Sequence, residues 1–158
     1  MFKGEYYKGL VKKSSEQVKK HITQMKQEEI RFLVARLKSL NPKRLIVSKH
    51  LMNKTNVVFK SEDVRDIIKD KRLKDLIIEY NEIKIGNEID KRVLIRGRRN
   101  VNVLYKRSDG TFFEGLSNLC AVISLNKNCI ITCYWNLSND VHKSIDLNRY
   151  NKDLPIIN

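Results

Sequence analysis

The sequence has few of the residues that build metal sites, disulfide frameworks or nucleotide-binding loops. Its 158 residues include only three cysteines, three histidines and six glycines. No Cys-x-x-Cys pair, glycine-rich phosphate loop, dinucleotide fingerprint or paired-carboxylate motif is present. The sequence therefore predicts no metal and no cofactor. We expect Cys120, Cys129 and Cys133 to be buried in strands as small apolar side chains.

Long apolar runs are absent as well. No stretch reaches the length of a membrane span, and the first eight residues, Met-Phe-Lys-Gly-Glu-Tyr-Tyr-Lys, contain no apolar signal core. Hydrophobic residues still make up 41% of the chain, which is enough for a packed core. We therefore expect a folded, cytoplasmic protein without a membrane partner.

Positive charge is abundant and unevenly distributed. The chain holds 32 Lys and Arg against 18 Asp and Glu, a net charge of +14. Residues 1–60 alone hold 15 Lys and Arg against four acidic residues. Such a basic segment favours a polyanionic partner, and nucleic acid is the first candidate. Two of its lysines, Lys19 and Lys20, are predicted to contact nucleic acid from the exposed face of a helix.

Apolar residues recur at helical spacing through the first 72 residues. Two serines provide N-caps for the first helix, whose spacing slips once, between Met25 and Ile30. A Ser-Glu-Asp sequence at residues 61–63 is a cap followed by two acids, as helix starts require. The three predicted helices cover residues 14–40, residues 45–54 and the segment from residue 61 onward.

After residue 75 the spacing changes from helical to alternating, which is typical of strands. Turn signals lie at residues 108–111 and 126–128. The predicted fold is therefore α+β, with N-terminal helices packed on one face of an antiparallel β-meander of about four to five strands. We expect a single domain over residues 1–158, with a basic helical layer (1–72), an antiparallel sheet (73–150) and a C-terminal tail (151–158). The predicted strands cover residues 76–80, 92–96, 101–105, 119–125 and 129–136.

Histidine is rare, so each one is a candidate acid–base group. His50 and Lys54 are four residues apart, which would place them on one helix face, beside Lys49. Neighbouring ammonium groups favour the neutral imidazole, which can serve as a base, and they can also bind a phosphate. His142 follows the last strand near Asp140. His21 is expected to be a surface residue of the first helix.

The last strand contributes a second set of polar groups. Strand alternation places Thr132, Tyr134 and Asn136 on one face, with Cys133 and Trp135 toward the core. The alternative is an ordinary solvent-facing side of a sheet. Three arginines lie at the end of a neighbouring predicted strand: Arg96, Arg98 and Arg99. Their guanidinium groups are suited to bidentate contacts with phosphate.

The order of these elements resembles the barnase–EndoU–colicin–RelE group of small toxin and mobile-element ribonucleases. The likeness rests on Ser-Lys-His, Ser-Glu-Asp-Val, Arg-Val-Leu-Ile-Arg-Gly and Ile-Ile-Thr-Cys-Tyr-Trp-Asn, and it covers roughly residues 45–150. It implies a metal-independent endonuclease that cleaves RNA by attack of the 2′-hydroxyl. The resemblance assigns catalysis to His50, Lys54, Thr132 and Tyr134. The group leads us to expect Arg where Lys54 stands, so Arg96 or Arg98 is the alternative phosphate clamp.

Two other functions are compatible with the same residues. One is a nucleic-acid-binding or host-takeover regulator without catalysis, which the basic N-terminal segment alone would support. The other is a module whose basic face docks on an acidic protein, such as an inhibitor or antitoxin. The ribonuclease hypothesis is ranked first, with Lys49, Arg96, Arg98, Arg99, Asn136 and His142 binding the nucleic acid.

Overall fold

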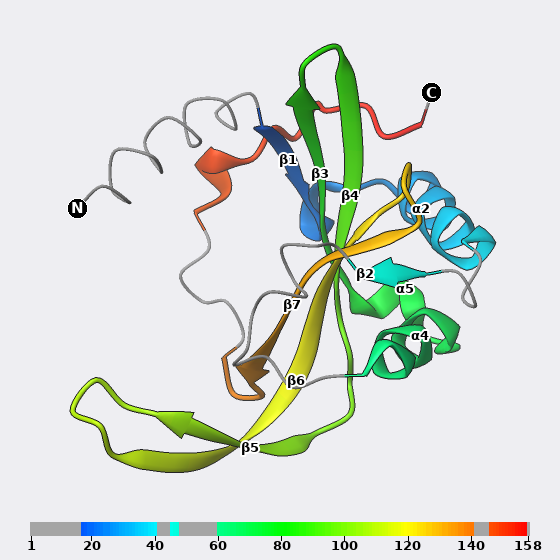
Figure 1. Ribbon diagram of the computed structural model, residues 1–158. Coiled ribbons are helices and arrows are strands. Elements are labelled where there is room, and N and C mark those ends of the chain that lie inside the picture. Colours follow the sequence, from blue (N-terminus) through cyan, green and yellow to red (C-terminus); the bar gives the residue numbers. More distant parts are fainter. Residues whose placement is uncertain (1–16, 41–44, 48–59, 141–145, 158) are drawn as a thin grey trace.

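The computed structural model describes residues 17–40, 45–47, 60–140 and 146–157 (Figure 1). A seven-stranded sheet in the order β1-β3-β4-β6-β7-β2 organises these residues, and β5 pairs with β6 outside that path. All pairs are antiparallel except β2, which runs parallel to β7. The strands are β1 (Gln17–His21), β2 (Ile46–Val47), β3 (Ile77–Ile85), β4 (Glu88–Arg96), β5 (Val101–Lys106), β6 (Phe112–Ser124) and β7 (Cys129–Leu137).

The described helices are short and lie before the main strands in the chain, which confirms the α+β class. They are α2 (Gln27–Ser39), α4 (Ser61–Lys69) and the single turn α5 (Leu73–Leu76), with 3-10 turns η1 (Ile22–Gln24) and η3 (Leu147–Arg149). Helix α4 begins where the Ser-Glu-Asp signal predicts, and Asp63 Oδ2 accepts the Lys60 backbone N–H at 3.0 Å. No helix in the described part of the chain is both long and apolar enough to cross a membrane.

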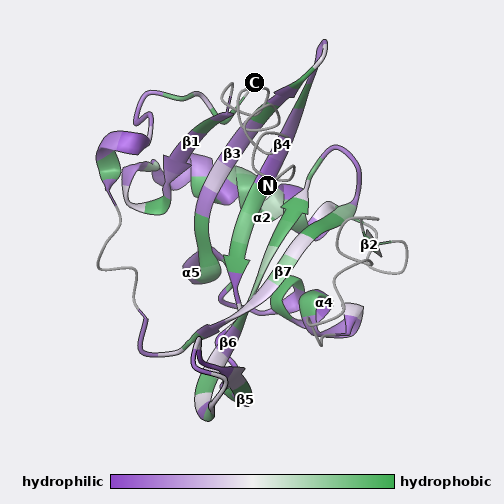
Figure 2. Cartoon of the chain, turned by 60° about the vertical axis from the view of Figure 1, so that its left-hand side comes forward, coloured by the Kyte–Doolittle hydropathy of each residue, from purple (hydrophilic) through white to green (hydrophobic). Residues whose placement is uncertain are grey.

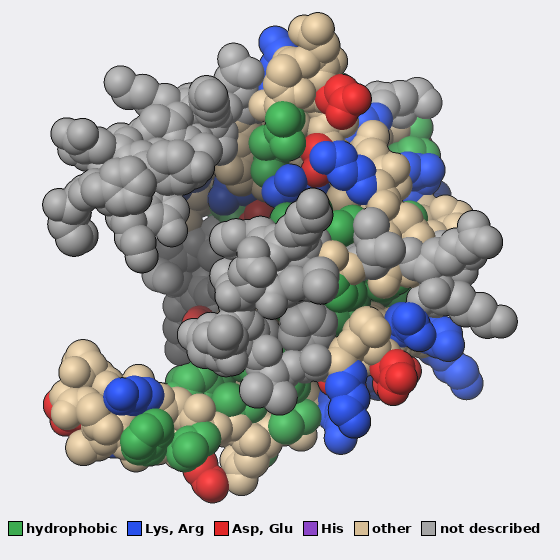
Figure 3. Space-filling model, viewed as in Figure 1, with side chains coloured by type: hydrophobic (Ala, Val, Ile, Leu, Met, Phe, Trp, Pro, Cys, Tyr) green, Lys and Arg blue, Asp and Glu red, His purple; other side chains and the backbone are tan. Residues whose placement is uncertain are grey.

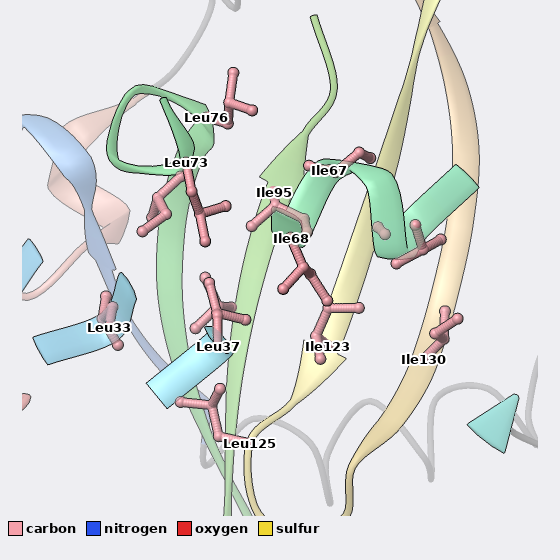
Figure 4. Close-up of a cluster of buried hydrophobic side chains, with 14 of the residues drawn as sticks. Leu33, Leu37, Ile67, Ile68, Leu73, Leu76, Ile95, Ile123, Leu125 and Ile130 are labelled. Atoms are coloured by element: carbon pink, nitrogen blue, oxygen red, sulfur yellow. The ribbon is translucent and has the colours of Figure 1, made fainter. Parts of the chain in front are cut away.

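The hydrophobic core is built from side chains of both the helices and the sheet (Figure 4). Helix α2 contributes Leu33 and Leu37, and α4 contributes Ile67 and Ile68. Alternate residues of the strands, such as Val93, complete the core because successive strand side chains point to opposite faces. Figure 2 shows the resulting pattern, with hydrophobic residues in the middle of the sheet and a hydrophilic end to the β3–β4 hairpin.

The first predicted helix is wrong over its N-terminal part. Residues 17–21 form strand β1, which pairs in register with β3 from Gln17–Ile83 to His21–Glu79. The helix starts only at Gln27, within the slip in the apolar spacing between Met25 and Ile30. Strand pairing over the whole length of β1 outweighs local helix propensity, which is a weak preference. The predicted N-terminal layer is thus only partly helical.

The predicted helix at residues 45–54 is also wrong where the structure describes it. Ile46 and Val47 form β2, which pairs with Cys129 and Ile130 of β7. Two adjacent β-branched residues favour a strand over a helix. Both turn signals are confirmed. Thr111 O accepts the Arg107 N–H at 2.7 Å, and the β6–β7 hairpin turns through residues 125–128.

The predicted C-terminal tail is an integral part of the fold. Leu154 and Ile156 are buried in the core. The Asn151 N–H donates to Lys19 O at 2.7 Å, so residues 151–156 are tied to β1. The edge of the sheet formed by β1 is therefore covered by a segment from the other end of the described chain.

Strand β6 takes part both in the main sheet and in a separate two-stranded arm. Its second half pairs with β4 and β7, whereas residues 112–117 pair with β5 to form a two-stranded arm. The arm projects from the sheet, and hydrophobic side chains are exposed on it (Figures 1 and 3). These exposed residues are Leu104, Phe112 and Leu116, each more than half exposed.

Candidate functional site

The face of the sheet opposite the core carries a row of polar side chains, here called the polar face. The register places His21 of β1 opposite Glu79 of β3, and Arg96 of β4 next to Cys120 and Tyr134. The core-side residues Tyr80, Val93 and Ile123 lie one position away, as alternation requires. The polar face is formed by Lys19, His21, Glu79, Asn81, Arg96, Asn118, Cys120, Thr132, Tyr134 and Asn136.

Glu79, His21 and Tyr150 form the acid–base part of the polar face. The Tyr150 hydroxyl donates to Glu79 Oε1 at 2.7 Å. The Tyr150 ring meets the His21 imidazole edge-on, with 5.4 Å between ring centroids, and the Lys19 ammonium lies 5.1 Å from the same ring. Burial, followed by the hydrogen bond and charge of Glu79, raises the pKa of Tyr150 above its usual value. Tyr150 therefore keeps its proton and acts as a donor to Glu79.

The His21 ring is oriented by the turn that follows it. Its Nδ1 lies 2.8 Å from Thr23 Oγ1 and accepts the Thr23 backbone N–H at 3.3 Å. Because Nδ1 accepts from the backbone, the neutral ring carries its proton on Nε2. A carboxylate acceptor and an imidazole donor are thus neighbours across one strand pair, where Cβ atoms are about 5 Å apart.

Tyr134 lies on the same face and keeps its hydroxyl protonated. Burial, followed by the thiol of Cys120 and the charge of Glu79, raises the pKa of Tyr134 to about 12. The side chain remains 38% exposed. It is therefore a hydroxyl donor that a ligand can reach, with half-buried Thr132 and Asn136 on either side along the strand. The predicted grouping of these three side chains is what the register shows.

Arg96 has a different role from the predicted phosphate clamp. Its Nη2 donates to Leu137 O at 2.8 Å, and its Nη1 donates to Asp140 O at 2.7 Å. Both Nε and Nη2 also donate to Asn118 Oδ1, at 3.2 and 3.0 Å. The guanidinium therefore joins β4, β6 and the turn after β7, and it does not present an open fork to a phosphate.

Lys20 is not available to a nucleic acid, contrary to prediction. It is 4% exposed, and its Nζ donates to Glu29 Oε1, Glu29 Oε2 and Leu154 O at 2.9–3.0 Å. An ammonium group has three protons, and each has an acceptor here. Lys19 lies on the polar face, as a binding role requires, and there it contacts Tyr150.

Arg98 and Arg99 lie away from the polar face, in the link between β4 and β5. Both are exposed, and Arg98 Nε donates to Asp70 Oδ2 at 2.7 Å. The remaining predicted residues, His50, Lys49, Lys54 and His142, lie outside the described residues. The structure thus brings together Thr132, Tyr134 and Asn136, but it does not bring Arg98 and Arg99 to them.

Sequence reasoning missed His21, Glu79 and Tyr150. His21 falls within the helix predicted from the sequence over residues 14–40. Its partner Glu79 lies 58 residues further along the chain, so no local pattern pointed to the pair. Gln-Val-Lys-Lys-His contains one apolar residue, Val18, so the apolar alternation that marks the later strands is absent there.

The described residues contain no group of three or more His, Cys, Asp or Glu side chains placed to hold a metal ion. Comparison of the chain with protein-family models, with curated proteins and with solved structures finds no match. The function must therefore be argued from the polar face and the charge of the chain.

Proposed function

We propose that this protein is a metal-independent endoribonuclease that cleaves RNA on the polar face of its sheet. The observation that carries the proposal is the His21–Glu79 register pair, with Tyr150 donating its hydroxyl to Glu79 and packing its ring against His21. An acid and a base side by side match the needs of RNA cleavage by its own 2′-hydroxyl. The net charge of +14 supports a polyanionic substrate. The resemblance to the barnase–EndoU–colicin–RelE group supports the same reaction.

The proposed arrangement places the helices and the substrate on opposite sides of the sheet. In this arrangement α2, α4 and α5 cover the side of the sheet that carries the hydrophobic core. Their apolar residues share the core with the sheet, which leaves the polar face as the side for substrate. A sheet with one covered and one open face is common among antiparallel sheets.

The proposed reaction proceeds in one displacement at phosphorus. Glu79 accepts the proton of the 2′-hydroxyl as the 2′-oxygen forms a bond to phosphorus. The bond from phosphorus to the 5′-oxygen breaks, and the protonated form of the His21 ring delivers a proton to that oxygen and becomes the neutral imidazole. The products are a 2′,3′-cyclic phosphate and a free 5′-hydroxyl. Lys19, Thr132 and Tyr134 supply donors to the phosphate oxygens, where developing charge is stabilised.

The test is cleavage of total RNA in EDTA by the wild type and by matched variants. We expect Glu79→Gln and His21→Ala to lower the cleavage rate by about 10²–10⁴. Gln keeps the acceptor for Tyr150, so the Glu79 variant should fold. Glu88→Gln makes the same change of charge at an exposed position at the far end of the β3–β4 hairpin, and it should cleave like the wild type.

His50→Ala belongs in the same experiment, because the sequence assigns His50 to this reaction. Loss of cleavage in His50→Ala with full activity in His21→Ala would move the acid to His50. Intact RNA with every protein, including the wild type, would refute catalysis. A gel shift in the same tubes would then separate a nucleic-acid-binding protein from one that docks on an acidic protein.

A further inference from the structure

A cavity of about 630 Å³ opens on the core side of the sheet, between α4 and the end of β4. Trp135 of β7 lines it, while its sequence neighbour Tyr134 points to the polar face. The sheet therefore separates the cavity from the polar face. It is lined by Lys60, Asp63, Asp66, Ile67, Asp70, Gly97, Arg98, Arg99, Val101, Leu119 and Trp135.

Much of the lining is apolar. Ile67 and Leu119 are 6% and 5% exposed, and Trp135 is half-buried against the core. Gly97 permits a close approach at this point, because a Cβ there would lie only 3.0 Å from Ile67 Cγ1. Aliphatic side chains and an indole suit a flat ring, which stacks on such surfaces without cost to its own hydrogen bonding.

The rest of the lining is charged and balanced in sign. Lys60, Arg98 and Arg99 provide three exposed cations. Asp63 and Asp70 already accept hydrogen bonds from the backbone of Lys60 and of Arg72. The Asp66 carboxylate is exposed on α4, and among the described residues no hydrogen bond or ion pair involves it.

We propose that this cavity holds a base of the bound RNA, one that carries an amino group. This inference rests on the proposed function, because it takes RNA as the substrate. A purely apolar ligand would leave the charged groups unused, and a bare anion would leave the Asp66 carboxylate and the apolar lining without a partner. A nucleotide with an amino group suits all three: the ring lies against Trp135, the exocyclic amino group donates to Asp66, and Arg99 contacts the phosphate.

The chemistry separates the bases. Adenine, cytosine and guanine each present an exocyclic amino group that can donate to a carboxylate. Uracil presents only its ring N3–H, which lies between two carbonyl oxygens that repel a carboxylate. The base in the cavity belongs to a nucleotide several positions from the cleaved bond, since the cavity and the polar face lie on opposite sides of β7. The cavity thus selects sequence, whereas the polar face performs the reaction.

The experiment uses the fluorescence of Trp135, which is the only tryptophan of the chain. The probes are 2′-O-methyl tetranucleotides of a single base, which lack the attacking hydroxyl and so bind without being cleaved. We expect the A, C and G probes to change the emission, and the U probe to bind at least about fivefold more weakly. Asp66→Asn should weaken the A, C and G probes by a similar factor and leave the U probe unchanged.

Glu62→Gln is the matched control, because it removes the same charge from an exposed position on the same helix outside the cavity. Equal weakening by both variants would show that the effect is only long-range charge, and the proposal would be wrong. It would also be wrong if probes bind, as measured by anisotropy of a labelled probe, without any change in tryptophan emission. If the change in tryptophan emission depends on the base but the protein cuts no RNA, the proposed base site in the cavity would stand and the proposed catalysis would be refuted.

Discussion

Lys20 and Glu29 form a buried ion pair in which Nζ lies 2.9 Å from Oε2 and both residues are less than 7% exposed. The pair joins β1 to the first turn of α2, and the same ammonium binds Leu154 O. Glu29 Oε1 also accepts the Lys26 backbone N–H at 2.9 Å, which caps the helix. One pair thus connects three segments.

Removing one partner of this pair should strongly destabilise the protein. Lys20→Met leaves the Glu29 carboxylate buried without its cation, and we expect a loss of about 3–5 kcal/mol in the free energy of unfolding. The double variant Lys20→Met/Glu29→Met should recover most of that loss, because apolar side chains can replace a buried pair. Urea unfolding measures both, and a double variant no more stable than the single would contradict the explanation.

The protonation of Glu29 should make the free energy of unfolding depend on pH. Burial alone would raise its pKa, but the Lys26 N–H and the Lys20 ammonium together hold the pKa below its ordinary value of 4.5. A carboxyl whose pKa is lowered by folding stabilises the protein above the unfolded pKa and loses that contribution as pH falls through the folded one. Urea unfolding from pH 6 to pH 3 should therefore show a steeper loss for the wild type than for Glu29→Gln.

Arg96→Ala should lower stability whether or not RNA is bound. The variant removes donors to Asn118 Oδ1, Leu137 O and Asp140 O. Hydrogen bonds from a charged group contribute about 1.5–3 kcal/mol each, so the free energy of unfolding should fall by at least about 2 kcal/mol. Arg99→Ala, which changes an exposed guanidinium a few residues away, should be close to neutral. Equal stability of the two variants would return Arg96 to a ligand-binding role.

The three cysteines should be unreactive in the folded protein. Burial raises the pKa of Cys120 to about 11 and that of Cys133 to about 12, and it also raises the pKa of Cys129. The reactive species is the thiolate, which is scarce at pH 8 under these conditions. Ellman's reagent should react slowly with the native protein and rapidly with all three thiols in urea. Fast labelling of one thiol without denaturant would show local opening of its strand.

The later strands were largely predictable from the sequence, because their alternation reports burial on one face. The segment Thr-Cys-Tyr-Trp-Asn places Cys133 in the core and Tyr134 outside, and the register agrees. Helix α4 was equally readable, since its cap and acidic first turn are local signals. The cap of α4 involves residues only a few positions apart. The strands have apolar residues at every second position, and a short stretch of sequence is enough to show this.

The N-terminal segment was not predictable in the same way. Whether Gln-Val-Lys-Lys-His becomes helix or strand depends on β3, which is about 60 residues away, and on Glu29 as a partner for Lys20. The candidate site was hard to predict for the same reason. His21, Glu79 and Tyr150 come from three distant parts of the chain, and no local pattern relates them. The engagement of Arg96 with backbone oxygens is likewise invisible in a list of cationic residues.

The tie between β1 and residues 150–156 determines when the candidate site can be completed during synthesis. Strand β1 is synthesised before Tyr150 and the Leu154 carbonyl, which lie more than 120 residues further along the chain. Until then Lys20 lacks one acceptor and Glu79 lacks the Tyr150 hydroxyl. If the protein has the proposed activity, its site stays incomplete until residues 150–156 have been synthesised and have packed against β1. A chain that stops before Tyr150 would lack the hydroxyl that binds Glu79.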